Sequence, residues 1–330
     1  MINFATLKAL AIPEGNVTRI TDASGRVLWK ESGVEENVEP AVLEVAKITS
    51  DTIVGETTYT GEEFILLDIY PQPYATVSVT YGGLTKTITD TSGVENPNAQ
   101  RVFFGTFNGV TDDVATPASG TLVIQGRIQA FGVGQYKTTA AIKNTFTYCN
   151  CITGVSSFGD VQYIPGYAFW ECSDLAITDL PDGITSIGGY AFYDCKSVCI
   201  TSFPEGLSSI DAKAFYMDTT QNRDIAMSGK TVTFPSSLLS VGAEAFNYRA
   251  YYELGGDHLY LTYIDTAVML SETPPTLGES AFGVRFYNYK SEPIGAGSNY
   301  MSVVVPKGCA EDYKSAPIWE QNYTHITEAS

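Results

Sequence analysis

Residues 187–198 read Ile-Gly-Gly-Tyr-Ala-Phe-Tyr-Asp-Cys-Lys-Ser-Val, and the pattern of this stretch returns along the chain. Its phenylalanine, Phe192, has counterparts at Phe169 and Phe215, at equal distances before and after it. A unit of about 23 residues cannot bury its own apolar face, so several copies must stack to build a shared core. The repetition therefore predicts a solenoid.

The same interval holds in several columns at once, which chance would not produce. The columns are Phe146, Phe169, Phe192 and Phe215, then Cys149, Cys172 and Cys195, and then Ile164, Ile187 and Ile210. Phe246 and Phe282 continue the first column after longer intervals. We expect these residues to form the interior of the repeats, with one aromatic ring in each coil.

Each copy begins with an extended stretch, at residues 175–177 in one coil and 198–200 in the next. We expect adjacent coils to pair these stretches as parallel strands about 4.8 Å apart. Pro181 and Pro204 would end the pairing, because proline has no N–H to donate.

These repeats resemble the BspA-type (Treponema-type) leucine-rich repeat. Residues 273–278 are similar to the last repeats of that family, and residues 305–308 and 313–319 resemble its C-terminal cap. The resemblance covers roughly residues 141–326 and implies a curved solenoid with a parallel sheet on one face. It also implies a bacterial surface protein that binds host proteins or other cells. The spacing departs from the family pattern in three segments, residues 216–233, 247–272 and 283–302.

The chain before the repeats reads differently. Residues 17–21 and 26–29 alternate around Asp-Ala-Ser-Gly at 22–25, which predicts a β-hairpin within a lead-in of residues 1–38. This lead-in resembles the opening segments of some phage or prophage structural proteins.

An immunoglobulin-like β-sandwich is expected at 39–137, because short strands recur there. They are expected at residues 41–48, 63–69, 75–81, 84–89, 101–107 and 121–131, with a tight turn at Gly82-Gly83. The expected fold is therefore mainly β, with the sandwich followed by leucine-rich repeats at 138–310 and a C-terminal cap at 311–330.

The charge composition excludes some classes of binding partner. The 330 residues include 37 acidic and 19 basic side chains, for a net charge of −18. This balance argues against nucleic acid and anionic membrane surfaces, which attract clustered Lys and Arg. No segment approaches the ~18 consecutive apolar residues of a membrane span, so we expect no membrane insertion. Because the N-terminus lacks the pattern of a secretory signal, either a signal was removed or the protein leaves the cell another way.

No set of residues suggests catalysis or metal binding. The histidines are His258 and His325, and neither has a neighbouring group that would orient it as a catalytic base. The cysteine spacing fits none of the usual zinc patterns, so we expect free, buried thiols. Acidic loops such as Asp112-Asp113 could hold Ca²⁺, but no EF-hand spacing supports this. We therefore expect no catalytic residues, no metal and no cofactor.

Tyrosines in the expanded segments are the positive signal for binding, because tyrosine combines a large contact area with a polar tip. The alternative is that these rings cover the longer loops on the flank of the solenoid. The candidates are Tyr248, Tyr251, Tyr252, Tyr260, Tyr287 and Tyr289.

The function expected from these features is noncatalytic binding. The protein would be an adhesion module of the bacterial surface or secreted space, and it would recognise a protein or glycan through a rigid repeat surface. The alternative is a tail-associated structural or host-binding protein of a phage or prophage, located in the virion. A third hypothesis, an enzyme, has no supporting constellation of residues.

Overall fold

The computed structural model divides the chain into two compact units, residues 1–38 and 39–330. The residues that it describes are 19–21, 27–30, 38–54, 57–73, 75–90, 99–107, 109–112, 117–137, 146–148, 150–218, 225–251, 258–283, 285–287, 301–319 and 325–330. In the first unit, β1 (Arg19–Thr21) pairs antiparallel with β2 (Val27–Lys30). These are strands of the predicted hairpin, whose loop lies outside the described residues.

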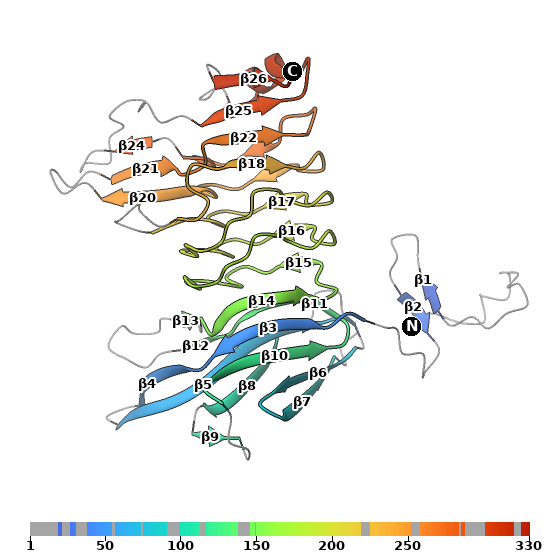
Figure 1. The fold of residues 1–330 in the computed structure, drawn as a ribbon, viewed down its shortest axis with the longest axis vertical. Helices are drawn as coiled ribbons and strands as arrows, with labels where there is room; N and C mark the ends of the chain where they lie inside the picture. The colour runs from blue at the N-terminus through green and yellow to red at the C-terminus, as the bar shows by residue number, and fades with distance from the viewer. Residues whose placement is uncertain are drawn as a thin grey trace, which may run out of the picture. The chain divides into compact units, whose positions relative to one another are not determined.

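The second unit begins with two antiparallel sheets (Figure 1). One sheet has the order β14-β3-β10-β6-β7, with β3 at Ala41–Ala46, β6 at Thr76–Tyr81, β7 at Leu84–Thr89, β10 at Ser119–Gln125 and β14 at Ile152–Phe158. The other has the order β11-β5-β8-β9, with β5 at Thr57–Pro71, β8 at Gln100–Phe107, β9 at Val110–Thr111, β11 at Ile128–Val133, and β4 (Ile48–Val54) also pairing with β5.

The two sheets share one core. Alternate residues of β6 point inward, as Val77 and Val79 show, and the ring of Tyr81 lies 5.7 Å from that of Phe104 in the other sheet. The predicted turn between β6 and β7 is confirmed: Tyr81 pairs with Leu84 across Gly82 and Gly83, whose φ angles are +59° and +83°. Glycine suits both positions because it accepts positive φ.

Two predicted strands are wrong in their extent. The stretch at 121–131 is two strands, β10 and β11, which belong to different sheets. The chain leaves the first sheet at Gly126, where φ is +129° and a Cβ would lie 2.7 Å from the carbonyl oxygen of Thr76. The stretch at 41–48 likewise ends at Ala46, and residue 48 begins β4 in the other sheet. At Gly126 the apolar residues Ile124 and Ile128 keep the same phase, so hydropathy could not reveal that break.

The strand β14 joins the first sheet to the part of the chain that follows it. This strand pairs with β3 at the edge of the first sheet, although the sequence placed its residues among the repeats. Backbone hydrogen bonds also join β11 to the first coil. Val133 N–H donates to Ala168 O at 2.7 Å, and Gln162 N–H donates to Gln129 O at 2.8 Å. The sheets and the repeats therefore share a hydrogen-bonded junction.

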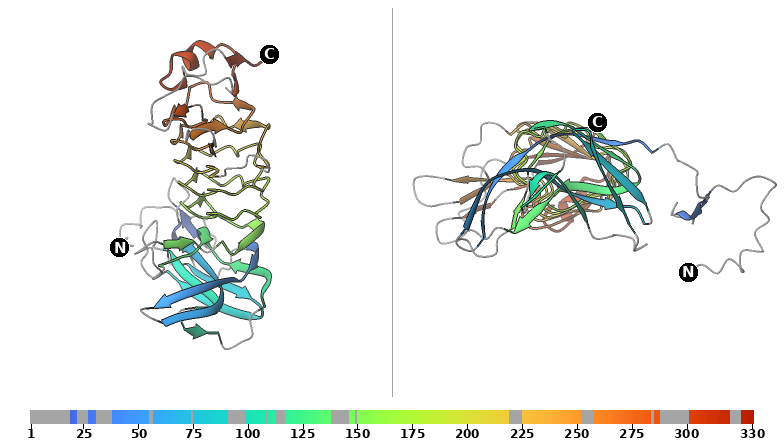
Figure 2. Two further views of the ribbon diagram at one scale, coloured as in Figure 1. Left: turned by 90° about the vertical axis from the view of Figure 1, so that its left-hand side faces the viewer. Right: turned by 90° about the horizontal axis from the view of Figure 1, so that it is seen from below.

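The repeats stack one coil on the next (Figure 2). One parallel ladder of two-residue strands joins five coils, with Ile187 paired to Ile164 on one side and to Ile210 on the other. Its strands are β15 (Tyr163–Ile164), β16 (Ser186–Ile187), β17 (Ser209–Ile210), β19 (Ser240–Val241) and β23 (Thr276–Leu277).

The parallel strands do not lie where they were predicted in the early coils. Residues 175–177 and 198–200 are joined by one hydrogen bond, from Cys199 N–H to Ile177 O at 2.8 Å, and they form no ladder. In later coils this extended stretch is longer, and it forms a second parallel ladder. The strands of this ladder are β18 (Thr231–Phe234), β22 (Thr266–Met269), β25 (Ser302–Val305) and β26 (Ile326–Glu328).

A third limb of each coil is a chain of turns that bonds to the next coil. Tyr190, Phe192 and Asp194 donate their N–H groups to carbonyl oxygens of the following coil at 3.1, 2.7 and 2.8 Å. Tyr190 and Asp194 have φ angles of +59° and +55°. A left-handed backbone costs a non-glycine residue roughly 1–2 kcal/mol, and the bonds between coils offset this cost.

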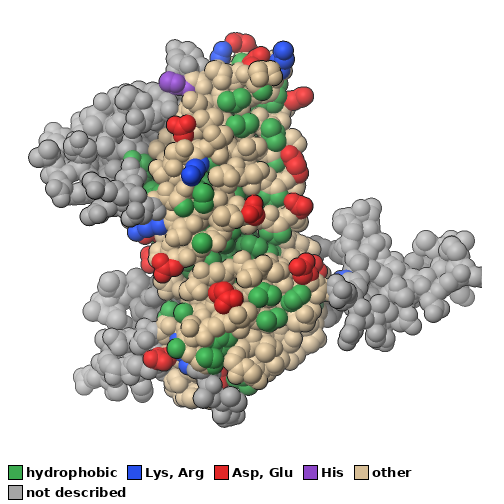
Figure 3. All heavy atoms as spheres, in the orientation of Figure 1, with side chains coloured by type: hydrophobic (Ala, Val, Ile, Leu, Met, Phe, Trp, Pro, Cys, Tyr) green, Lys and Arg blue, Asp and Glu red, His purple; other side chains and the backbone are tan. Residues whose placement is uncertain are grey.

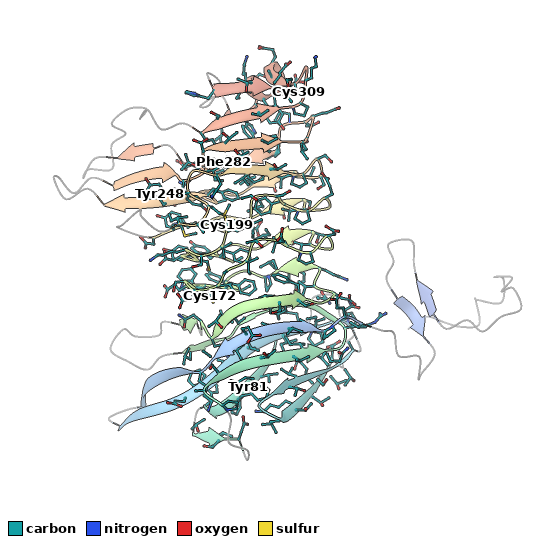
Figure 4. The ribbon with its side chains drawn as sticks, viewed as in Figure 1. Tyr81, Cys172, Cys199, Tyr248, Phe282 and Cys309 are labelled. Atoms are coloured by element: carbon teal, nitrogen blue, oxygen red, sulfur yellow. The ribbon has the colours of Figure 1, made fainter. Side chains whose placement is uncertain are left out.

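The phenylalanine column runs through the interior of the coils. Ring centroids are 5.1 Å apart for Phe169 and Phe192, 5.0 Å for Phe192 and Phe215, and 5.0 Å for Phe215 and Phe246, all stacked. Phe282 adds a further ring 5.5 Å from Phe246, and Figure 4 shows it among the coils. The added residues of the longer repeats therefore do not interrupt the column.

Both ends of the phenylalanine column are covered. At the C-terminal end Trp319 lies 5.9 Å from Phe282 and donates to Pro275 O, and Tyr313 in α1 (Ala310–Ser315) donates to Ser271 O. At the other end Phe131 and Phe158 meet Phe169 edge to face. The repeats and the two sheets therefore bury one continuous apolar core.

Residues of two expanded segments form a separate antiparallel sheet beside the coils (Figure 1). Its strands are β20 (Asn247–Tyr251), β21 (His258–Thr262) and β24 (Arg285–Tyr287). A short pair, β12 (Gln135–Lys137) and β13 (Phe146–Tyr148), precedes the first coil.

Replacing Phe192 by alanine should lower the free energy of unfolding by roughly 3–5 kcal/mol, because the ring has no exposed surface and lies between two others. Urea denaturation followed by circular dichroism measures this change. The control is Leu239→Ala, whose side chain is 69% exposed and whose loss should change stability by no more than about 0.5 kcal/mol. A loss below about 1 kcal/mol for Phe192→Ala would contradict a role of the column in stability.

Candidate functional site

Five aromatic side chains line the outer side of the turn limb, and we call them the aromatic ridge. They are Tyr167, Trp170, Tyr190, Tyr193 and Tyr216. Tyr167 is 37% exposed, the next three are partly exposed, and Tyr216 is buried. Tyr216, at 4% exposed, is the buried end of its row and adds no contact surface of its own.

The rings of the aromatic ridge are stacked in two rows along the repeats. In one row Tyr167 and Tyr190 lie 5.0 Å apart with an interplanar angle of 9°. In the other, Trp170 and Tyr193 lie 4.0 Å apart at 2°, and Tyr193 and Tyr216 lie 5.4 Å apart at 15°. Tyr193 is therefore covered on both faces, by Trp170 and by Tyr216.

The repeat interval accounts for these rows. Tyr167 and Tyr190 are one repeat apart in sequence, and so are successive members of the row Trp170, Tyr193 and Tyr216. They flank the phenylalanines in sequence but leave the coil on its other side, in a turn limb where left-handed residues recur four positions apart, as at Tyr190 and Asp194. The stacking of the coils thus builds an ordered aromatic surface from side chains that are distant in sequence.

A lysine of the chain already lies on the rings. Lys213 Nζ is 5.1 Å from the ring centroid of Tyr216 and 5.8 Å from that of Tyr190, and it lies 3.4 Å from Glu244 Oε2. An ammonium group over an aromatic face is attracted by the π electrons. The aromatic ridge therefore accommodates a cation together with a carboxylate.

Carboxylates gather beside Tyr193. Its phenol donates to Asp218 Oδ2 at 3.0 Å, and Asp194 lies 3.9 Å from the ammonium group of Lys196. Burial raises the pKa of Asp194 to about 6; Glu171 and Asp218 add to the rise, and Lys196 opposes it. Figure 3 shows acidic side chains scattered over one face of the molecule.

The cysteines of the repeat are buried thiols. Cys172 and Cys195 are free, and Cys195 Sγ contacts Phe169 O at 2.8 Å. Burial raises the pKa of both thiols, so neither is a thiolate near neutral pH. Burial also raises the pKa of Cys151 to about 12. Cys149, the first member of the column, lies outside the described residues.

The tyrosines singled out from the sequence are placed only in part. The ring of Tyr248 is 5% exposed and belongs to the core, which leaves little of it for a partner (Figure 4). Tyr251, Tyr260 and Tyr287 lie on β20, β21 and β24, whose side chains there are not described. His258 pairs with Tyr251 and Tyr287, so the sheet brings these three positions side by side. Tyr252 and Tyr289 lie outside the described residues.

The aromatic ridge is not a local cluster of tyrosines in the sequence, so the density of tyrosines in the expanded segments did not indicate it. Its signal is periodicity: an aromatic residue precedes or follows the core phenylalanine at the same offset in successive repeats. The repeat interval, sought in polar and aromatic columns as well as in apolar ones, would have found it.

Metal and membrane sites were also sought. Within the described ranges no group of three or more His, Cys, Asp or Glu side chains is arranged to hold a metal ion. Asp112, weighed as a calcium ligand, instead binds Lys86 Nζ at 2.7 Å and the N–H of Gly105 at 2.8 Å. Of the helices in the described part of the chain, none has the length and apolar character needed to cross a bilayer.

The comparison with known proteins agrees with the geometry of the coils. Residues 139–248 match the BspA type leucine rich repeat region, in six copies. The matched residues include the aromatic ridge and four rings of the phenylalanine column. Repeats of this type commonly mediate protein interactions and occur in surface or secreted proteins. No curated protein matches the chain.

Cys172 and Cys195 should resist alkylation in the folded protein, because burial keeps them neutral and inaccessible. Mass spectrometry after treatment with iodoacetamide at pH 8 would show modification of both only after urea is added. Rapid labelling of either residue without urea would contradict its place in the interior.

Asp194→Asn should stabilise the protein at pH 7.5 and have less effect at pH 5. The pKa of Asp194 rises from 3.8 to about 6 on folding, so its contribution to stability is present at low pH and is lost as pH rises through about 6. Asparagine also tolerates the positive φ at this position.

Thermal unfolding of wild type and Asp194→Asn at the two pH values measures this gap. The matched control is Asp182→Asn, in an exposed turn before β16. If the difference in stability between wild type and Asp194→Asn does not depend on pH, the surroundings of Asp194 do not raise its pKa.

Proposed function

We propose that the protein is a noncatalytic binding or adhesion protein of the bacterial surface or secreted space. It recognises a protein or a glycan through a rigid repeat surface. The observation that carries this proposal is the aromatic ridge, where five rings are held in register by the stacking of the coils. The match to BspA type repeats supports it.

Rigidity is the physical basis of the proposed mechanism. The rings are fixed by contacts with one another and by a backbone that bonds to the next coil, so little rotamer entropy remains to be lost on binding. Aromatic side chains with polar tips are also typical of the energetically dominant residues of interfaces.

The proposed function assigns a supporting role to the parts of the chain around the aromatic ridge. The two antiparallel sheets before the repeats serve as an immunoglobulin-like sandwich, and the coils as a solenoid closed by a C-terminal cap. The shared core between them supports this reading, because it would hold the aromatic ridge at a constant distance from the sheets.

A tail-associated protein of a phage or prophage is the second candidate. The pairing of β1 with β2 favours it, since this hairpin belongs to the segment that resembles the opening of phage structural proteins. In that case the protein would be located in the virion, and the repeats would contact the host. Tail genes beside the gene for this chain would support this candidate.

The experiment for binding is a glycan and host-protein array probed with the intact chain. The variant Tyr167→Asn/Tyr190→Asn removes one row of rings, and asparagine suits the φ angles of +62° and +59° at these positions. We expect the variant to lose binding to the array ligand while its melting temperature changes little.

Leu239→Asn, an exposed site away from the aromatic ridge, is the matched control and should bind as wild type does. Binding of the double variant at the wild-type level would exclude the aromatic ridge as the binding surface. Tyr251→Ser/Tyr252→Ser tests in the same assay whether the tyrosines of the expanded segment contribute.

A further inference from the structure

The carboxylates beside the aromatic ridge are not balanced by cations of the chain. All three carboxylates belong to residues around Tyr193: Glu171 N–H donates to Tyr193 O at 2.8 Å, the phenol of Tyr193 donates to Asp218 Oδ2 at 3.0 Å, and Asp194 is the next residue in the chain. Among the described side chains, the only ammonium group within 4.0 Å of these three carboxylates is Lys196, 3.9 Å from Asp194. Asp194 Oδ1 is buried and accepts no hydrogen bond there. Three negative charges thus face one positive charge.

In the neighbouring coil a lysine of the chain itself occupies a comparable site of aromatic rings and a carboxylate. There Lys213 sets its ammonium group against the rings of Tyr190 and Tyr216 and within 3.4 Å of Glu244 Oε2. The arrangement combines aromatic carbon for the stem of a basic side chain with a carboxylate for its head. The surface at Trp170 and Tyr193 has both components, with three carboxylates, Glu171, Asp194 and Asp218, around one ammonium group, Lys196.

The ring geometry favours a polypeptide over a sugar. Sugars stack on open aromatic faces, whereas both faces of Tyr193 are covered, by Trp170 at 4.0 Å and by Tyr216 at 5.4 Å. Ring edges and carboxylates remain, and these suit a methylene stem that ends in a charged group. Arginine fits best, because its planar guanidinium can bond to two carboxylate oxygens at once.

We infer that the aromatic ridge docks a basic segment of a partner protein. The head group of an arginine or lysine lies among Glu171, Asp194 and Asp218, and its stem lies along the edges of Trp170 and Tyr193. This inference rests on the proposed binding function and names the class of partner. The net charge of −18 would also speed the approach of a cationic segment.

The test uses the full chain and a fluorescently labelled peptide that alternates arginine and serine. Its counterpart carries citrulline, which keeps the shape of arginine without the charge. Fluorescence anisotropy should show binding of the arginine peptide and little binding of the citrulline peptide. We expect Asp194→Asn/Glu171→Gln to raise the Kd about tenfold, as loss of charge-assisted hydrogen bonds does.

General attraction to an acidic protein is separated by the control Asp182→Asn/Glu205→Gln, which removes two exposed charges away from the aromatic ridge. This control should bind the arginine peptide as wild type does. An equal loss of affinity in both variants, or equal binding of the citrulline peptide, would overturn the inference.

Acidification gives an independent readout. Lowering the pH from 7.5 to 5 should weaken binding of the arginine peptide, because Asp194 gains a proton near pH 6. Glu171, Asp218, Lys196 and Tyr193 are the other ionisable groups around it. Asp194→Asn should reduce this pH effect, and an unchanged pH effect would argue against Asp194 as a contact.

The array experiment separates this inference from the proposed function. If no arginine peptide binds, yet Tyr167→Asn/Tyr190→Asn abolishes binding to an array ligand, the aromatic ridge is a binding surface and only the basic partner is overturned. If the double variant binds the array as wild type does, the proposed function of the aromatic ridge fails as well.

Discussion

The contact between Phe169 and Phe192, repeated up the chain to Phe282, is the interaction on which the structure depends. Each coil contributes one ring that only the next coil can cover, so no coil is stable without a neighbour. The column ends against Trp319 on one side and Phe131 and Phe158 on the other. The repeats are therefore closed at both ends, and the sheets before them act as one of the closing elements.

The backbone of the turn limb converts this stacking into a surface. Hydrogen bonds from Tyr190, Phe192 and Asp194 to the next coil set the spacing, and left-handed residues send neighbouring side chains outward. The same register that stacks phenylalanines inside stacks tyrosines and Trp170 outside. The stacking of the core therefore also positions the aromatic ridge. The spacing of the coils likewise sets the positions of the carboxylates beside it.

The packing of the repeats could be predicted from the sequence, whereas the strand boundaries of the two sheets and the candidate site could be predicted only in part. Apolar columns such as Ile164, Ile187 and Ile210 predict packing because every coil must bury the same positions. The break at Gly126 was not predictable, since Ile124 and Ile128 keep the alternation through it, and the pairing of β14 with β3 depends on a strand far away in the chain. Tyr248 illustrates the same limit for the site: a tyrosine in a dense cluster proved to be part of the core.

By itself, the sequence determined that residues 164–282 stack in register, because a short unit with in-phase apolar columns has no other way to exclude water, whereas Phe146, predicted as the first ring, lies on the antiparallel strand β13. Only the tertiary structure decided which limb forms the ladders, which sheet each strand joins, and which aromatic rings face outward. These choices depend on backbone hydrogen bonds between segments far apart in the chain, and on left-handed residues such as Tyr190 that no pattern of hydropathy records.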